Sequence, residues 1–270
     1  GMMFGRRGRS TMLRWGIVLA GLQITLWQIV DLGWGSFIWV AAMIALVIAV
    51  GALTARWMKL SLPFGILSGG AVAICGASAA LALASLLGEK KAHQAQLTVV
   101  LVTVSAASAL AMSLYPALTH LIGLSDRQAG WLVGSSIHDV AQALGAGYSI
   151  SDEAGQTATI VKLTRVAMLA PALAIIALIV PIEPGQSREK IGLPWFVAGF
   201  LVLGAANSLV TIPLIVTAWS AETTSWLLLL AVTATGIRSP MHLLIDMGWR
   251  SAAPVAAATL AALALALAGA

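Results

Sequence analysis

The sequence predicts an all-α membrane protein, a single polytopic helix bundle of about nine spans that occupies residues 1–270. Three observations predict this fold class. Of the 270 residues, 60% are hydrophobic and only 9% are charged, and the mean hydropathy of +0.96 is above the range of soluble domains. The apolar residues gather in runs long enough to cross a bilayer. The basic residues gather in alternate connections between these runs.

Each predicted span is an apolar run of about 20 residues, the length that crosses the hydrocarbon core. The N-terminal stretch GMMFGRRGRS has neither the apolar core nor the cleavage site of a signal peptide, so we expect the first run to be a mature span. The longest polar connection, residues 183–190, is expected to be an interhelical loop. The nine runs are 11–30, 36–56, 63–86, 96–120, 128–148, 156–181, 194–216, 224–243 and 252–270.

The distribution of basic residues predicts a multi-pass membrane protein with a cytoplasmic N-terminus. In this orientation ten basic residues of the short connections lie on the inner side and two on the outer side. Because these residues are scattered and form no patch with interleaved aromatic residues, no nucleic-acid partner is expected. The inner residues are Arg6, Arg7, Arg9, Arg14, Arg56, Lys59, Arg127, Arg188, Lys190 and Arg250, and the outer ones are Lys90 and Lys91.

Two pairs of stretches suggest internal duplication. Residues 16–35 align without gaps to residues 231–250, and by the span count the copies run in opposite directions, as in the inverted repeats of secondary transporters. Chance similarity between apolar helices of low complexity is the alternative. Residues 73–87 and 135–149 also resemble each other, but the count gives them the same direction. A re-entrant segment or a permuted duplication would reconcile this second pair with an inverted repeat.

The segment 69–81 is a candidate for a discontinuous helix, because Gly69, Gly76 and Ser78 lie within an apolar run. Backbone groups freed by a helix break persist at membrane depth only where protein buries them or where they line a wet cavity. A face of small residues that packs against another helix is the alternative. The single cysteine, Cys75, excludes an internal disulfide and a cysteine-built metal site.

The segment 134–142, reading GSSIHDVAQ, carries the strongest local signal for a binding site. We place Ser135 and Ser136 at the start of a half-helix, where hydroxyl and unpaired N–H groups bind anions. His138 and Gln142 are four positions apart and are expected to share a face.

Ionisable residues inside apolar spans are expensive unless they have a partner or a task. His138 titrates near neutrality and adjoins Asp139, so the two suit ion coupling, and a structural polar pair is the alternative. Lys162 and Arg165 are three positions apart and are expected to point together into the bundle. Two buried cations repel unless an acid or an anionic ligand neutralises them, so we expect Asp139 to pair with one and a substrate with the other. Snorkelling of both cations to the interface is the alternative.

Arg238 lies toward the inner end of the span 224–243, close to Pro240, whose kink would free backbone groups. It is either an anion contact or an interfacial anchor. No nucleotide-binding loop occurs, and the four histidines are too widely spaced for a local metal motif, so no enzyme, cofactor or metal is expected.

The sequence resembles the family of YeiH-like bacterial inner-membrane proteins, which is described as a family of sulfate exporters. The resemblance covers nearly the whole chain, and its SIHDVAQ and KLTR elements are specific. It implies a fold similar to bile-acid-symporter and sodium/proton-antiporter bundles, about two further spans before the first one here, and export as the direction. Where the family tends to have Thr and Ser, this chain has Val72 and Ala73. The matching stretches are LRWGIVLAGLQ (13–23), ICGASA (74–79), Tyr115-Pro116, GLSDRQAGWLVGSSIHDVAQALGAG (123–147), 157–171, PWFVAGFLVLGAANS (194–208) and LLLLAVTATGIR (227–238).

We therefore expect a secondary transporter of a small anion, such as sulfate, sulfite or a sulfonate, coupled to a proton or a sodium ion. Paired cations beside a helix N-terminus suit a tetrahedral oxyanion. The alternatives are a non-transporting scaffold or partner subunit, and a membrane enzyme acting on sulfur compounds. A homo-oligomer is compatible with the sequence. The expected substrate-binding residues are Ser78, Ser135, Ser136, His138, Asp139, Gln142, Lys162, Arg165 and Arg238.

Overall fold

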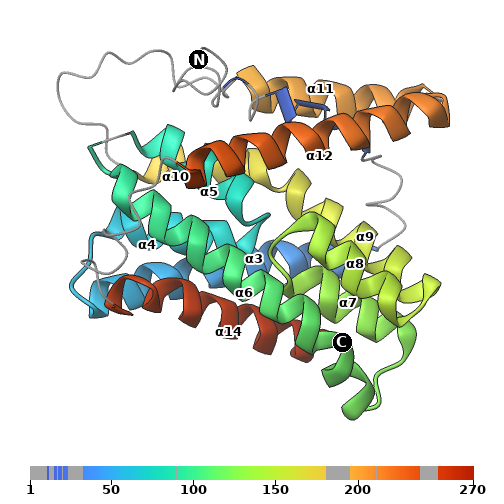
Figure 1. Cartoon of the computed structure of the whole chain (residues 1–270), viewed down its shortest axis with the longest axis horizontal. Coiled ribbons are helices and arrows are strands. Elements are labelled where there is room, and N and C mark those ends of the chain that lie inside the picture. Colours follow the sequence, from blue (N-terminus) through green and yellow to red (C-terminus); the bar gives the residue numbers. More distant parts are fainter. Residues whose placement is uncertain are drawn as a thin grey trace. The chain divides into compact units, whose positions relative to one another are not determined.

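The structure is a computed structural model that describes residues 11, 15–16, 18–19, 21–23, 33–88, 90–180, 195–210, 212–237 and 249–270. Figure 1 shows that these residues form helices, which confirms the all-α prediction. Arg238, the loop 183–190, and the larger part of the span 11–30 and of both copies of the 16–35 repeat lie outside them. The helices are η1 (Gly21–Gln23), α3 (Trp34–Trp57), α4 (Leu62–Ala73), α5 (Ala77–Leu87), α6 (Gln94–Leu121), α7 (Asp126–Ser136), α8 (Val140–Ile150), α9 (Asp152–Ala167), α10 (Leu169–Ile179), α11 (Trp195–Leu209), α12 (Leu214–Ile237), η2 (Trp249–Ser251) and α14 (Ala253–Ala268).

The described residues contain three helices that are long and apolar enough to cross a membrane: Gly35–Trp57, Gln94–Leu121 and Asp152–Ile179. They correspond to the predicted spans 36–56, 96–120 and 156–181. The count of nine spans is not confirmed, because the predicted spans 63–86 and 128–148 are each divided into two short helices. The boundary between the predicted spans 194–216 and 224–243 is also displaced. Helix α12 begins directly after Pro213, whose carbonyl accepts hydrogen bonds from the backbone N–H groups of Val216 and Thr217. The N–H groups at the start of a helix have no acceptor within the helix, so a proline, which has no N–H, is tolerated at this position.

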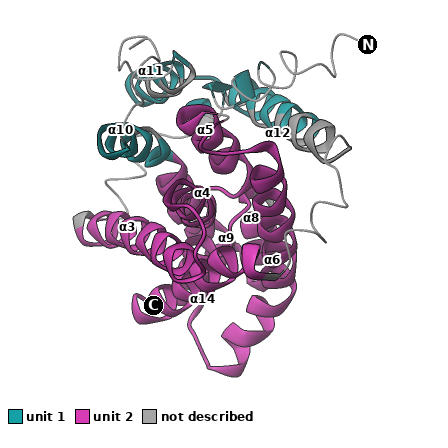
Figure 2. Cartoon of the chain, turned by 90° about the vertical axis from the view of Figure 1, so that its left-hand side faces the viewer, with its two compact units in different colours: residues 1–31, 167–239 teal, residues 32–166, 240–270 magenta. Residues whose placement is uncertain are grey.

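The chain divides into two compact units, coloured separately in Figure 2. One unit comprises Gly1–Asp31 and Ala167–Ser239, and the other comprises Leu32–Val166 and Pro240–Ala270. In the first unit, the Asn207 amide donates to the Leu22 carbonyl at 2.8 Å. The second unit contains both divided spans and eight of the nine predicted site residues. The prediction of a single transmembrane domain over residues 1–270 stays a prediction.

Helices α4 and α5 form a helical hairpin instead of one straight span. A Cβ atom added to Gly70 of α4 would lie 2.4 Å from Cδ1 of Leu83 in α5. In one continuous helix these positions would be about 20 Å apart. Helix α5 therefore turns back along α4, and the turn is residues 74–76.

Helices α7 and α8 fold back in the same way. An added Cβ on Gly134 of α7 would lie 2.9 Å from the Cα of Ala158 in α9, and one on Gly147 of α8 would lie 2.8 Å from the Cβ of the same alanine. Two positions that would be about 20 Å apart in a straight helix thus pack on one residue. The turn is residues 137–139. Both stretches of the second similar pair, 73–87 and 135–149, therefore include the turn of a helical hairpin.

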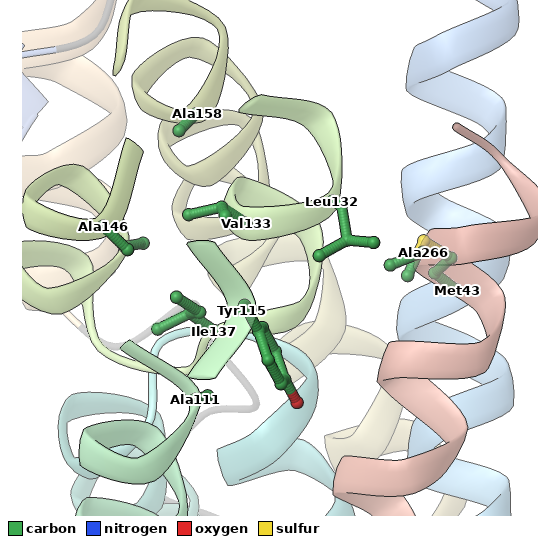
Figure 3. Packing of buried hydrophobic residues seen from close by; sticks show 10 residues of the cluster. Met43, Ala111, Tyr115, Leu132, Val133, Ile137, Ala146, Ala158 and Ala266 are labelled. Atoms are coloured by element: carbon green, nitrogen blue, oxygen red, sulfur yellow. The ribbon is translucent and has the colours of Figure 1, made fainter. Parts of the chain in front are cut away.

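Small residues allow these close approaches. Added Cβ atoms on Gly65 and Gly69 would lie 2.7 Å and 2.8 Å from backbone Cα atoms of α3. The segment 69–81 therefore has both features offered as alternatives, a small-residue packing face at Gly69 and a helix break at Gly76. Figure 3 shows that alanines and larger apolar side chains of α7, α8 and α9 pack together beside Tyr115 of α6, which buries the second hairpin in the unit.

A hydrogen bond at one end of the second unit does not fit the count of nine spans. The Gln128 amide, in the first turn of α7, donates to the carbonyl of Ala270 at 2.7 Å. The nine-span count places residue 128 at the inner face and residue 270 at the outer face, so it is wrong for one of them. The division of 63–86 and 128–148 into hairpins agrees with this bond, since a hairpin begins and ends on the same side.

Candidate functional site

The turns of the two hairpins touch each other. Gly76 has φ +67° and ψ −122°, a backbone conformation that L residues other than glycine rarely adopt. A Cβ atom added to Gly76 would lie 3.6 Å from the Cβ of His138. The break in 74–76 and the break in 137–139 therefore form one junction, which we call the hairpin junction.

Lys162 of α9 reaches this junction with a fully buried side chain, 0% exposed. An ammonium group has three N–H donors. Each of them has an acceptor here, so the ammonium links the two breaks through backbone oxygens. The acceptors are the carbonyl oxygens of Ile74 at 3.0 Å, of Ile137 at 2.7 Å and of His138.

Arg165, one helical turn further along α9, is 3% exposed and also binds backbone oxygens from both hairpins. The last four carbonyl groups of a helix have no partner within that helix, and the C-terminal end of the helix dipole favours a cation. Lys162 and Arg165 thus stabilise the C-terminal ends of α4 and α7. The Arg165 guanidinium donates to the carbonyl oxygens of Val72 at 2.8 Å, Ala73 at 2.8 and 2.9 Å, Gly134 at 3.2 Å and Ile137 at 3.3 Å.

The sequence correctly predicts that Lys162 and Arg165 point together into the protein, since both donate to the Ile137 carbonyl. The alternative of snorkelling to the interface is wrong. Among the described residues, no carboxylate lies within ion-pair distance of either cation. The carbonyl dipoles satisfy their hydrogen bonds without cancelling their charge, so the junction keeps an excess of positive charge.

Asp139 is not the partner that we expected for one of these cations. Its Oδ1 accepts a hydrogen bond from the backbone N–H of Gln142 at 3.1 Å, so it caps the N-terminus of α8. Its own N–H donates to the Ser108 hydroxyl of α6 at 3.0 Å. A short carboxylate directly before a helix binds the free N–H groups of the first turn more readily than it reaches across a junction.

Ser135 and Ser136 occupy the last turn of α7, not the first turn of a half-helix as predicted. Their hydroxyls donate back into that helix, Ser135 to the Trp131 carbonyl at 2.6 Å and Ser136 to the Leu132 carbonyl. The helix break follows them, because Asp139 is a better N-cap in this segment. His138 therefore lies in the break and does not share a helical face with Gln142. The Gln142 Oε1 is buried, and no described residue provides it with a hydrogen bond.

His138 is fully buried, and its Nε2 lies 3.0 Å from the Thr259 hydroxyl of α14. The Thr259 hydroxyl donates its proton to the Val255 carbonyl at 2.8 Å. The direction of the hydrogen bond between Nε2 and this hydroxyl is set by the tautomer of the imidazole ring. The Nδ1 atom is buried and has no hydrogen-bond partner among the described residues.

The first turn of α5 has no side-chain N-cap. Its N-cap, Gly76, provides no side-chain hydrogen bond, in contrast to Asp139 before α8. Ser78 in this turn is half-buried, and its hydroxyl has no hydrogen-bond partner among the described residues. A helix N-terminus presents N–H donors and positive potential, so this turn is the part of the junction best suited to an anion.

Sequence reasoning missed the two hydroxyls that hold the second break in place, Ser108 and Thr259. Thr259 is the single polar residue of α14, and that isolation is the signal that could have indicated it. Ser108 lies among several small polar residues of α6, and nothing in the sequence distinguishes it. The ninth predicted residue, Arg238, lies outside the described residues.

Comparisons with known proteins agree with a membrane location. Residues 6–254 match the model of the family described as Conserved hypothetical protein 698. The chain is 39% identical over 254 residues to the UPF0324 membrane protein TauZ of Paracoccus denitrificans, covering 92% of this chain and 75% of that protein. It is 37% identical over 244 residues to a UPF0324 membrane protein of Chlorobaculum tepidum, covering 89% of this chain and 68% of that protein. No solved structure matches the chain.

Proposed function

The chain belongs to the family described as Conserved hypothetical protein 698, the YeiH-like family that its sequence resembles, and from this premise we propose that it is a secondary transporter of small oxyanions or sulfonates. Sulfate, sulfite and small organic sulfonates are the proposed substrates, and export is the proposed direction. The proposed activity is movement of an anion across the bilayer without chemical turnover.

The observation that carries this proposal is the excess positive charge of the hairpin junction. Lys162 and Arg165 are buried there without a carboxylate within ion-pair distance among the described residues. A buried charge is unfavourable until an opposite charge approaches it, so this junction favours an anion. Because the donors of Lys162 and Arg165 are already bound to carbonyl oxygens, we propose that they act on the substrate through their field more than through direct contact.

Direct contacts are proposed at the N-terminal side of the hairpin junction. The first turn of α5 has no side-chain N-cap, and the Ser78 hydroxyl has no hydrogen-bond partner among the described residues, so both suit the oxygens of a sulfate or sulfonate group. Gln142, in the first turn of α8, is the proposed second polar contact. Ser135 and Ser136 are proposed to support the break and not to touch the anion, because their hydroxyls already donate within α7.

The two hairpins also suit alternating access. We propose that α4–α5 enters the bilayer from the cytoplasmic face and α7–α8 from the outer face, so that their turns meet near mid-depth. Transporters bind substrates at such interrupted helices, between inverted repeats. This arrangement makes the stretches 73–87 and 135–149 an inverted pair. It also moves Lys90 and Lys91 to the cytoplasmic side, which leaves Arg127 as the outer one of the twelve basic residues counted in the sequence.

Flux into proteoliposomes tests the proposal. Radiolabelled sulfate, sulfite and taurine are offered to the wild-type protein, to Ser78→Ala and to Ser113→Ala, which removes the hydroxyl of an exposed serine of α6 that donates to the Ala109 carbonyl. We expect saturable flux of at least one anion and a loss of about tenfold or more in Ser78→Ala, since one hydrogen bond to a charged group contributes about 1.5 to 3 kcal/mol. Ser113→Ala should match the wild type. An absence of anion flux in all three proteins would favour a scaffold role.

A further inference from the structure

We infer that the Lys162 ammonium takes the place of a bound alkali cation at the hairpin junction, so that the protein works without a resident sodium ion. The inference rests on the proposed transport function only for its consequence for coupling. It starts from one geometric fact. Carbonyl oxygens from two separate helix breaks converge on a single Nζ atom, which approaches them from a third element, α9.

The groups that Lys162 binds are those that transporters offer to a monovalent cation. Unwound backbone carbonyls and the C-terminal ends of half-helices coordinate Na⁺ in discontinuous-helix transporters. Such oxygens can replace the hydration shell of the ion. Here the oxygens of Ile74 and Ile137 lie 3.0 and 2.7 Å from the Nζ, and the His138 oxygen completes the set. An ammonium group has the same unit charge, and the lysine stem holds it at this position permanently.

The surrounding charges leave no place for a second cation at these oxygens. Arg165 shares the Ile137 carbonyl with Lys162 and binds the neighbouring carbonyls of α4. The nearby carboxylate, Asp139, accepts from the Gln142 N–H and is not within ion-pair distance of either basic residue. A sodium ion would therefore meet two positive charges without a paired negative one. Coupling, where it occurs, then uses a proton and not sodium.

Thermal unfolding of the purified protein in detergent tests the inference, in sodium, potassium and choline chloride at matched ionic strength. The wild type should have the same apparent Tm in all three salts. Lys162→Ala removes the ammonium and leaves the three oxygens facing the space of the lost side chain. We expect it to unfold at a lower temperature in choline and to gain about 5 to 10 °C when sodium or potassium is about 100 times its dissociation constant.

Two matched variants define the site. Lys162→Met fills most of the same space without a charge, so it should be destabilised in every salt. Lys59→Ala changes an exposed lysine and should behave like the wild type. A sodium-dependent rise in the wild-type Tm would overturn the inference, and so would a Lys162→Ala protein that neither cation stabilises. Recovery of folded Lys162→Ala only when sodium or potassium is present during purification would support it, and failure to recover it in any salt would overturn it. Because no anion is used, these results stand whether or not the protein transports sulfonates.

Discussion

His138 and Thr259 join the turn of the second hairpin to α14 through a hydrogen bond of 3.0 Å between Nε2 and Oγ1. The two residues are far apart in the sequence, and the bond fixes the position of the imidazole ring. Thr259→Val, which keeps the shape and removes the hydroxyl, should lower the free energy of unfolding by about 1 to 2 kcal/mol, because a buried ring nitrogen loses its hydrogen-bond partner.

The matched variant for this bond is Thr259→Ser, which retains the hydroxyl and loses one methyl group. Its free energy of unfolding should remain within about 0.5 kcal/mol of the wild-type value. Chemical denaturation in mixed micelles measures both variants. If Thr259→Val were as stable as the wild type, the bond would not hold the hairpin turn in place.

Arg165 is expected to be the most important single side chain for the stability of the hairpin junction. Arg165→Ala leaves the carbonyl ends of α4 and α7 unsatisfied in a buried place, so the free energy of unfolding should fall by about 3 to 5 kcal/mol. Arg165→Lys keeps the charge but not the fork of donors, and its stability should be intermediate. The exposed Arg56 provides the control, since Arg56→Ala should change the stability by less than about 0.5 kcal/mol. Equal stability of Arg165→Ala and Arg56→Ala would refute the bridging role.

Gly76 is expected to be irreplaceable for a conformational reason. Its φ of +67° with ψ −122° is strained for any side chain, so Gly76→Ala should destabilise the protein by about 1 to 3 kcal/mol and displace the turn against His138. Gly123 has a similar φ of +69°, but a Cβ there would meet nothing within 4 Å. Gly123→Ala should therefore be the milder change and should lower the free energy of unfolding by about 1 kcal/mol. Thermal unfolding of both variants in parallel checks the order, and the opposite order would contradict the role given to the turn.

The proposed orientation of the hairpins is tested by labelling single cysteines with a membrane-impermeant maleimide. The native Cys75 is 5% exposed, so the background should be low. Lys90→Cys should react in inside-out vesicles and Arg127→Cys in right-side-out vesicles. The nine-span arrangement predicts the reverse for both residues, so a single experiment decides between the two arrangements.

Much of the fold follows from local sequence signals. The apolar runs predict α3, α6 and the combined α9 and α10 within a few residues, and glycine within an apolar run predicts the break at Gly76. The hairpins could not be predicted in the same way, because an apolar run of 24 residues has the same composition whether it crosses the bilayer or turns back halfway. Contacts such as that of Gly70 with Leu83 distinguish a hairpin from a straight span, and such contacts form only when the helices pack in the folded protein.

The sequence predicts which residues lie at the candidate site better than it predicts what each of them binds. Lys162 and Arg165 were identified because buried charge is rare in apolar helices, and the structure places both at the junction. Their carbonyl acceptors carry no signal in the sequence, since every residue has a backbone oxygen. The same limit applies to Asp139, which the sequence leads us to expect beside Lys162 or Arg165 and whose partner in the structure is the backbone N–H of Gln142. Ser78 is a candidate in the sequence as the polar residue of the segment 69–81, and its hydroxyl, which has no partner among the described residues, makes it the anion contact that we propose.

The central claim is that an anion binds at the hairpin junction, and equilibrium binding tests it most directly. Thermal unfolding of the wild type and of Ser78→Ala is measured in detergent with increasing sulfate, sulfite, taurine or sulfoacetate, with chloride as the ionic-strength control. A ligand that binds only the folded state must raise the Tm. We predict a saturable rise in Tm with at least one of these anions in the wild type. In Ser78→Ala the anion concentration that gives the half-maximal rise should be higher by about tenfold or more. No rise beyond that of chloride with any of the four anions, or an identical rise in both proteins, would contradict the account.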